Sequence, residues 1–220
     1  MFLVIFDVNP KPERWNDHMR YVRLLTPALK TIDGFVDNER FASTRRAGWF
    51  VSMSTWRDEK ALIRWRTLGA HHEVQAKGRA QVFCDYHLRV GEIVADTHLP
   101  DGCVLRERRF DETEIGTAKV TTVTERQLVD APSAPIADVL AASLGGRPAE
   151  ARPEPIEWDL FEHIYQPGRF LLLNFWPDAG AARGWLAQAP TEARHRTVRL
   201  IRDYGMFDRA EAPQYYPAAR

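Results

Sequence analysis

The sequence predicts an α+β protein made of two similar βαββαβ units whose antiparallel sheets pack face to face. The main observation is an internal repeat, in which residues 48–65 and 168–185 align without a gap. Each copy has the pattern of a strand followed by a helix that begins after an aspartate N-cap. The matching pairs are Gly48 and Gly168, Phe50 and Phe170, Trp56 and Trp176, Asp58 and Asp178, Ala61 and Ala181, and Trp65 and Trp185.

The order of elements around the first copy explains why two units are needed. A strand–helix–strand–strand–helix–strand unit carries both helices on one face of its sheet and leaves the other face bare. Monomers rarely expose an apolar face of that size. A duplicated chain can bury it by pairing its own two sheets, so an intramolecular pseudo-dimer is predicted. The sequence leaves open whether the pair associates further into a homodimer.

Length and charge set the class of protein. A chain of 220 residues is long enough for two units of about 100 residues, each with its own core. Thirty basic and thirty acidic residues balance, which argues against nucleic acid or an anionic membrane as partner. The apolar N-terminal run meets Asp7 too early for a signal peptide, and no apolar run reaches the roughly 20 residues of a membrane helix. A cytoplasmic protein is expected, with Cys84 and Cys103 as reduced thiols that lack metal-ligand spacing.

The first unit is expected to span residues 1–96. A first helix opens at Pro12 and ends at Gly34, and Pro27 inside it is expected to kink or break it. Gly91 is expected to mark a bulge in the closing strand. The other predicted elements are strands over residues 2–8, 35–42, 49–56 and 82–94, a helix after Asp58, and a short helix that carries His71, His72 and Gln75 and stops at Gly78.

A polar linker over residues 97–113 and a second unit over residues 114–220 follow. The second unit is expected to repeat the first in a diverged form and to end in a polar tail from Asp208. Its predicted elements are strands over residues 116–124 and 158–166, a helix over 135–144, a loop over 147–155, the repeated strand and helix, and a last strand over 198–207.

Several short motifs carry a resemblance to a known family. They are Ser54-Thr55-Trp56-Arg57-Asp58, Trp65 six residues before His71, the run from His71 through Gln75 and Gly78 to Arg79, and Tyr86-His87-Leu88-Arg89-Val90. With them, the first 96 residues resemble the antibiotic biosynthesis monooxygenase-like proteins of the dimeric α/β-barrel superfamily, and the second half does so in outline.

The resemblance implies a cavity between the sheet and the helices of a unit. Enzymes of this family oxygenate polycyclic phenols with O2 and without metal or flavin, or open haem, and many members have no established activity. Haem-opening members place an asparagine in the first strand, which has no clear counterpart here, since Asp7 lies near that position and Asn9 just past it. They also separate their tryptophan and histidine by more residues than lie between Trp65 and His71. Haem degradation is therefore the weaker alternative.

His71 is the candidate catalytic residue. A neutral imidazole can take a proton from a phenol, and electron transfer from the phenolate to O2 would start the oxygenation. The candidate substrate-binding residues are Trp65, Asn38, Arg40, His72, Arg79 and Asp85. Structural alternatives stand beside these roles: helix-end hydrogen bonds for His71 and Arg79, core packing for Trp65, strand pairing for Asp85 and a surface position for His72.

The predicted function is a cofactor-independent monooxygenase of a small aromatic molecule, phenolic or quinol-like, with no metal or other cofactor. The alternative is a small-molecule-binding or stress-associated barrel without turnover. In the second unit, Thr191 stands six residues after Trp185, and His195 stands at the position of Gln75. The substrate cavity is therefore expected in the first unit, with the second unit mainly as its sheet partner.

Overall fold

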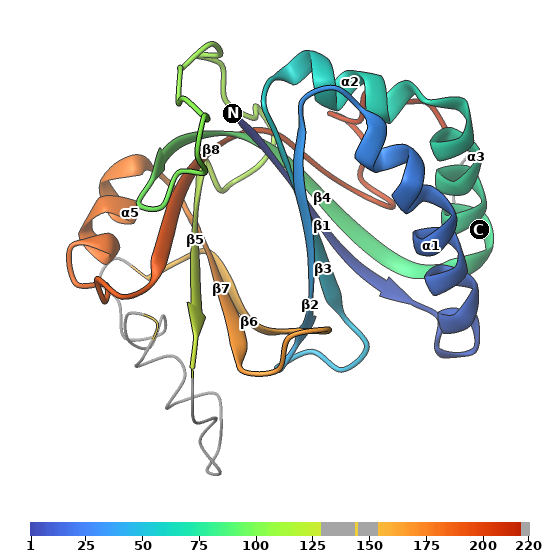
Figure 1. Cartoon of the computed structure of the whole chain (residues 1–220), viewed down its shortest axis with the longest axis horizontal. Coiled ribbons are helices and arrows are strands. Elements are labelled where there is room, and N and C mark those ends of the chain that lie inside the picture. The colour runs from blue at the N-terminus through green and yellow to red at the C-terminus, as the bar shows by residue number, and fades with distance from the viewer. Residues whose placement is uncertain (129–143, 145–153, 217–220) are drawn as a thin grey trace.

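The computed structural model describes residues 1–128, 144 and 154–216. In this part of the chain, eight antiparallel strands form one closed barrel in the order β1–β3–β2–β6–β7–β5–β8–β4 (Figure 1). The strands are β1 (Phe2–Pro10), β2 (Phe35–Ser43), β3 (Phe50–Trp56), β4 (Phe83–Asp96), β5 (Val120–Gln127), β6 (Glu157–His163), β7 (Arg169–Trp176) and β8 (Arg194–Gly205). The α-helices are α1 (Trp15–Thr31), α2 (Glu59–Thr67), α3 (Gly69–Lys77) and α5 (Ala179–Leu186).

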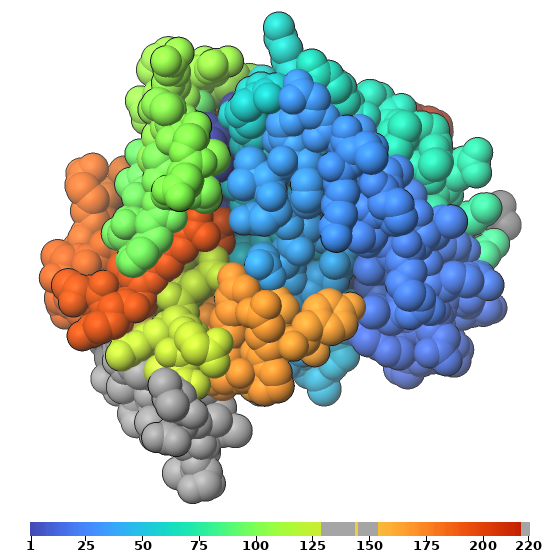
Figure 2. All heavy atoms as spheres, in the orientation of Figure 1, coloured from blue at the N-terminus to red at the C-terminus, as the bar shows by residue number. Residues whose placement is uncertain are grey.

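The two sheets face each other across an apolar barrel interior, which confirms the predicted fold class. Each contributes to one continuous core, with Leu3 and Met53 from the first unit and Phe161 and Leu173 from the second. The structure adds that both edges are joined by backbone pairing, β2 with β6 and β4 with β8. In the space-filling view, the hairpin between β6 and β7 lies directly against the first unit (Figure 2). Closure leaves no sheet edge open among these strands.

The helices cover the outer faces of the barrel, with α1, α2 and α3 on the first sheet and α5 on the second (Figure 1). The repeat predicts the matching helix starts correctly. Asp58 accepts a hydrogen bond from the Ala61 amide at 2.9 Å, and Asp178 accepts the equivalent bond at 2.9 Å. Trp56 and Trp176, which end the repeated strands, are both fully buried.

Helix α1 runs without interruption through Pro27, so of the expected kink or break at this proline, the break is wrong. Proline removes the hydrogen bond to the carbonyl four residues earlier, here that of Arg23. Arg23 and Pro27 both lie on the exposed face of the helix, where water can bond that carbonyl. The apolar face still packs on the sheet, and Leu29 is buried.

The second unit departs from the repeat after α5. Strand β8 begins at Arg194, four residues earlier than predicted, and residues 187–193 contain no counterpart of α3. His195 therefore lies in a strand and not at the helical position of Gln75. Its Nε2 donates to the Pro190 carbonyl at 2.7 Å, and its Nδ1 lies 3.0 Å from the Thr124 hydroxyl. The helix expected over residues 135–144 falls outside the described residues, apart from Leu144.

Gly91 marks the predicted irregularity where β4 meets β8. The register shifts between Val90 and Gly91. A Cβ added at Gly91 would lie 2.4 Å from the carbonyl oxygen of Arg199 on the neighbouring strand. The seam between the two units thus depends on a residue without a side chain at this point.

A buried ion cluster joins the two units inside the barrel. Arg46, from the loop between β2 and β3, contacts Asp7 at 2.8 Å and Asp159 of β6 at 2.6 Å. Asp159 also accepts from the Ser43 hydroxyl at 2.8 Å and from the Leu160 amide at 2.8 Å. Among the described residues, Asp7 has Arg46 as its one side-chain partner, and its Oδ1 is buried there without a hydrogen-bond partner. Burial in this setting raises the pKa of Asp7 to about 6.

Within the described residues, no helix has the length and apolar character that crossing a lipid bilayer requires.

Candidate active site

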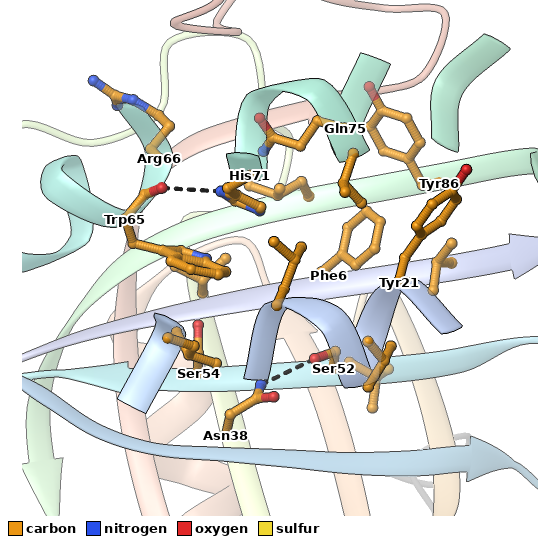
Figure 3. A pocket seen from close by; sticks show the side chains of 18 of the residues that line it. Phe6, Tyr21, Asn38, Ser52, Ser54, Trp65, Arg66, His71, Gln75 and Tyr86 are labelled. Atoms are coloured by element: carbon orange, nitrogen blue, oxygen red, sulfur yellow. Dashed lines mark hydrogen bonds between the residues drawn. The ribbon is translucent and has the colours of Figure 1, made fainter. Parts of the chain in front are cut away.

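A cavity of about 230 Å³ lies between the outer face of the first sheet and helices α1, α2 and α3 (Figure 3). An apolar cavity of roughly 150 Å³ can hold benzene, so this one has room for an aromatic ring with substituents. Strand pairing arranges its floor as two adjacent rows of side chains. One row consists of Asn38, Ser54, Val4, Val90 and Arg202, and the other of Arg40, Ser52, Phe6, Leu88 and Tyr204.

His71 lies in the first turn of α3 and contacts Trp65 in two ways. Its Nδ1 is 3.0 Å from the Trp65 carbonyl oxygen, and its ring stacks on the indole with centroids 4.1 Å apart (Figure 3). A carbonyl oxygen can only accept, so Nδ1 carries the proton and Nε2 keeps a lone pair. Burial lowers the pKa of His71 to about 4, so the imidazole is neutral at pH 7. The arrangement holds a fixed ring that can accept a proton at Nε2.

Asn38 presents a polar group on the floor of the cavity. Its Nδ2 donates to the Ser52 hydroxyl at 3.0 Å and to the Met53 carbonyl at 2.8 Å. These bonds fix the amide, and its Oδ1 accepts no hydrogen bond from the described residues. That oxygen can therefore accept a hydrogen bond from a hydroxyl group in the cavity.

The structure brings four of the predicted site residues together, since Asn38, Arg40, Trp65 and His71 all line the cavity. The other three, His72, Arg79 and Asp85, do not line it. His72 is exposed on the other side of α3 and stacks on Tyr216 at 5.3 Å. Arg79 is buried and donates to the Tyr86 hydroxyl at 3.2 Å, and Asp85 accepts from the Tyr86 amide at 2.8 Å.

His18 lines the cavity and was not among the candidates from the sequence. Its ring packs against Trp15 at 5.8 Å and Phe50 at 5.6 Å. Burial lowers the pKa of His18 to about 4, so it is a second neutral imidazole. The spacing from Trp15 to His18 to Val22 fits the apolar stripe of α1, and this pattern could have indicated an inward histidine.

The C-terminal segment of the second unit forms part of the cavity wall, through Arg209, Pro213, Gln214 and Tyr216. The Gln214 side-chain amide donates to the Arg66 carbonyl at 3.1 Å and to Gln75 Oε1 at 3.2 Å. Tyr216 donates to the same Gln75 oxygen at 3.0 Å. The second unit thus contributes to the site as well as covering the sheet.

The equivalent place in the second unit is occupied differently. Trp185, the counterpart of Trp65, is buried in a cluster with Trp176, and their ring centroids are 5.8 Å apart. Thr191, which stands where the spacing would place a histidine, is exposed in a turn. The stacked pair of Trp65 and His71 therefore has no counterpart at these positions.

The first-strand positions relevant to haem opening do not face the cavity. Phe6 and Val8 of β1 line it, whereas Asp7 points into the barrel interior and Asn9 is not among the lining residues. Among the described residues, no group of three or more His, Cys, Asp or Glu side chains is arranged to hold a metal ion.

Comparison with known proteins gives consistent matches. A family model described as antibiotic biosynthesis monooxygenase matches residues 1–77. "Jasmonate monooxygenase ABM" of Pyricularia oryzae is 38% identical over 223 residues, covering 100% of both chains. Similar solved structures include an anthrone oxidase-like protein (12% identity, TM-score 0.38, covering 97% of this chain and 96% of that chain). Another is a putative monooxygenase from Lactobacillus acidophilus NCFM (8% identity, TM-score 0.40, covering 92% and 94%). On the full-length match, this chain belongs to the antibiotic biosynthesis monooxygenase family.

Proposed function

We propose that this protein is a monooxygenase that binds a small organic substrate in the cavity of the first unit and uses His71 as the base. The observation that carries the proposal is the neutral imidazole of His71, held by the Trp65 carbonyl at 3.0 Å with Nε2 unprotonated. The cavity of about 230 Å³ gives this base a partly enclosed, largely apolar surrounding. A base in such a place can create a carbanion or phenolate away from water.

The proposed reaction needs an acidic C–H group beside a phenol or quinol. Nε2 of His71 takes a proton from the substrate methylene group, and the carbanion passes one electron to O2. The resulting substrate radical and superoxide combine and take back the proton to give a hydroperoxide. Loss of water leaves a carbonyl, so that one methylene group and one O2 molecule give one ketone group and one water molecule. The Asn38 Oδ1 could hold a substrate hydroxyl during these steps.

A second substrate class comes from the relative named for jasmonate, which matches this chain over its full length. Both classes belong in one assay. Oxygen uptake is measured with anthrone, a benzyl-substituted hydroquinone and jasmonate, for the wild type, His71→Ala and the control His98→Ala, an exposed histidine that does not line the cavity.

With a phenolic substrate, His71→Ala is expected to lower kcat by about 100- to 10,000-fold, the usual contribution of a general base. His98→Ala should leave it unchanged. If the wild type consumes oxygen and His71→Ala is equally active, the assigned base is wrong. If the wild type binds these compounds without oxygen uptake, the non-catalytic binding alternative is favoured.

A further inference from the structure

The cavity carries an excess of positive charge. Arg40, Arg66, Arg202 and Arg209 line it, and the one carboxylate among the described lining residues is Glu59. Glu59 is already paired with Arg109, which lies outside the cavity, at 2.6 Å. Of the arginines, Arg209 donates to the Tyr86 hydroxyl at 2.7 Å and to the Gln214 carbonyl at 3.0 Å.

The Arg40 side chain is half-buried on the cavity floor, and its guanidinium has no ion-pair or hydrogen-bond partner among the described residues. Glu39, which precedes Arg40 in the sequence, points to the other face of β2, where it contacts His163 at 2.7 Å and Arg169 at 3.2 Å. Burial lowers the pKa of the Arg40 guanidinium, and its charge in turn helps to keep His18 neutral. A partly buried charge without a partner loses part of its hydration, and a ligand anion would offset that cost.

Arg66 and Arg202 are weaker candidates for the same role. The Arg66 guanidinium points away from the floor of the cavity (Figure 3). Arg202 lies on the opposite border of the floor, within electrostatic reach of Asp111. Arg40 starts the floor row that continues through Ser52 of β3 to Phe6 of β1 and Leu88 of β4. Neighbouring strands are about 4.8 Å apart, so apolar surface begins roughly 10 Å from the strand of Arg40.

We propose that the substrate is a small amphiphilic acid whose carboxylate binds Arg40 while its apolar body lies over Phe6 and Leu88. The proposal rests on the proposed function, in that it takes this cavity as the substrate site. A guanidinium and a carboxylate form charge-assisted, paired hydrogen bonds. The net positive lining would also attract an anion into the cavity.

The test compares an acid with its neutral ester. Binding of 1-naphthylacetate and of its methyl ester is measured by isothermal titration calorimetry with the wild type, Arg40→Gln, Arg40→Lys, Arg202→Gln and Arg23→Gln. Arg23 is an exposed arginine on α1 that does not line the cavity, so it is the matched control. Arg40→Lys keeps the charge, and thermal melting of each variant verifies the fold.

The wild type is expected to prefer the acid. Arg40→Gln should weaken acid binding by about 10- to 100-fold, the loss expected for hydrogen bonds to a charged group, and leave ester binding within about twofold. Arg40→Lys should keep part of the preference, and Arg23→Gln all of it. Equal affinity for acid and ester in the wild type, or binding of neither, overturns the proposal. Loss of the preference in Arg202→Gln and not in Arg40→Gln overturns the assignment to Arg40.

A separate variant distinguishes this proposal from the proposed function. His71→Ala should retain the preference for the acid even if oxygen uptake is lost. If no compound is oxygenated but the preference depends on Arg40, the acid site stands and the monooxygenase reaction fails.

Discussion

Replacement of Asp7 by Asn should change how the stability of the protein depends on pH. Burial raises the pKa of Asp7 to about 6 from its ordinary value of 3.8, because Arg46 is shared with Asp159 and Oδ1 has no donor. A carboxyl whose pKa is higher in the folded protein favours folding when it is protonated. Its contribution is complete below about pH 4 and is lost as the pH rises through 6.

The size of the effect follows from the same two pKa values. The gap between 3.8 and about 6 corresponds to roughly 3 kcal/mol of unfolding free energy, at about 1.4 kcal/mol for each pKa unit. Asparagine cannot ionise, so the variant should lack this pH dependence. Any constant cost of the amide in the buried cluster cancels when the same pair of proteins is compared at two pH values.

Urea unfolding, followed by circular dichroism at pH 4.5 and pH 7.5, measures the difference between wild type and Asp7→Asn. Relative to the wild type, the variant should gain most of the roughly 3 kcal/mol between these two conditions. Asp101→Asn, which removes an exposed carboxylate from the connecting segment, is the control. A wild-type-to-variant difference that stays constant across this range would refute the reasoning, because Asp7 would then titrate alike in the folded and unfolded chains.

Three further predictions concern the site and the seam between the units. If His71 is the base, kcat/KM should be constant from pH 5 to 8. It should fall only near the His71 pKa of about 4, because protonation removes the base. An inflection near pH 6.5 would contradict this. Gly91→Ala should destabilise the protein by roughly 1–3 kcal/mol in urea unfolding, since the added Cβ meets the Arg199 carbonyl at 2.4 Å. Gln214→Ala should weaken ligand binding in calorimetry by about 3- to 10-fold, because it removes two hydrogen bonds that hold the tail over the cavity.

The last two predictions have matched controls in the chain. A Cβ added at Gly69 would meet no atom within 4 Å, so Gly69→Ala should not destabilise the protein. Gln188 is an exposed glutamine away from the cavity, and Gln188→Ala should bind ligand as the wild type does. If Gly69→Ala costs as much as Gly91→Ala, steric contact at the seam is not the cause. If Gln188→Ala binds as weakly as Gln214→Ala, the tail contacts are not the cause either.

Local patterns were sufficient to predict most of the architecture. The capping aspartates and the tryptophans that end the repeated strands act through their own sequence neighbourhood, and both were predicted correctly. The irregularity at Gly91 was also predicted, although its cause is the Arg199 carbonyl on a distant strand. Pro27 was misjudged because its effect depends on whether the carbonyl that loses its hydrogen bond is exposed. That exposure depends on how α1 packs on the sheet, and the sequence of α1 alone predicts this packing only in part.

The site was predictable to a smaller extent. Periodicity placed Asn38 and Arg40 on one face of a strand but did not say which face meets the helices. Because Phe41 packs into the barrel interior, the alternate positions Asn38 and Arg40 of β2 face the helices. The contribution of the C-terminal tail had no local signal, since Gln214 and Gln75 are 139 residues apart in the chain. That Arg40 lacks a partner in the described part of the chain likewise depends on where Glu39, His163 and Arg169 lie in three dimensions.

Strand β8 and the C-terminal tail form one wall of the cavity, and this affects which amino-acid replacements the protein can accept. In a pair of identical chains, each amino-acid replacement is duplicated, so both binding places must tolerate it at once. Here Tyr204 and Gln214 belong to a different stretch of sequence from the helices they face. Covalent fusion therefore allows one compartment to be reshaped from either side independently, while the other stays filled with tryptophan and leucine side chains.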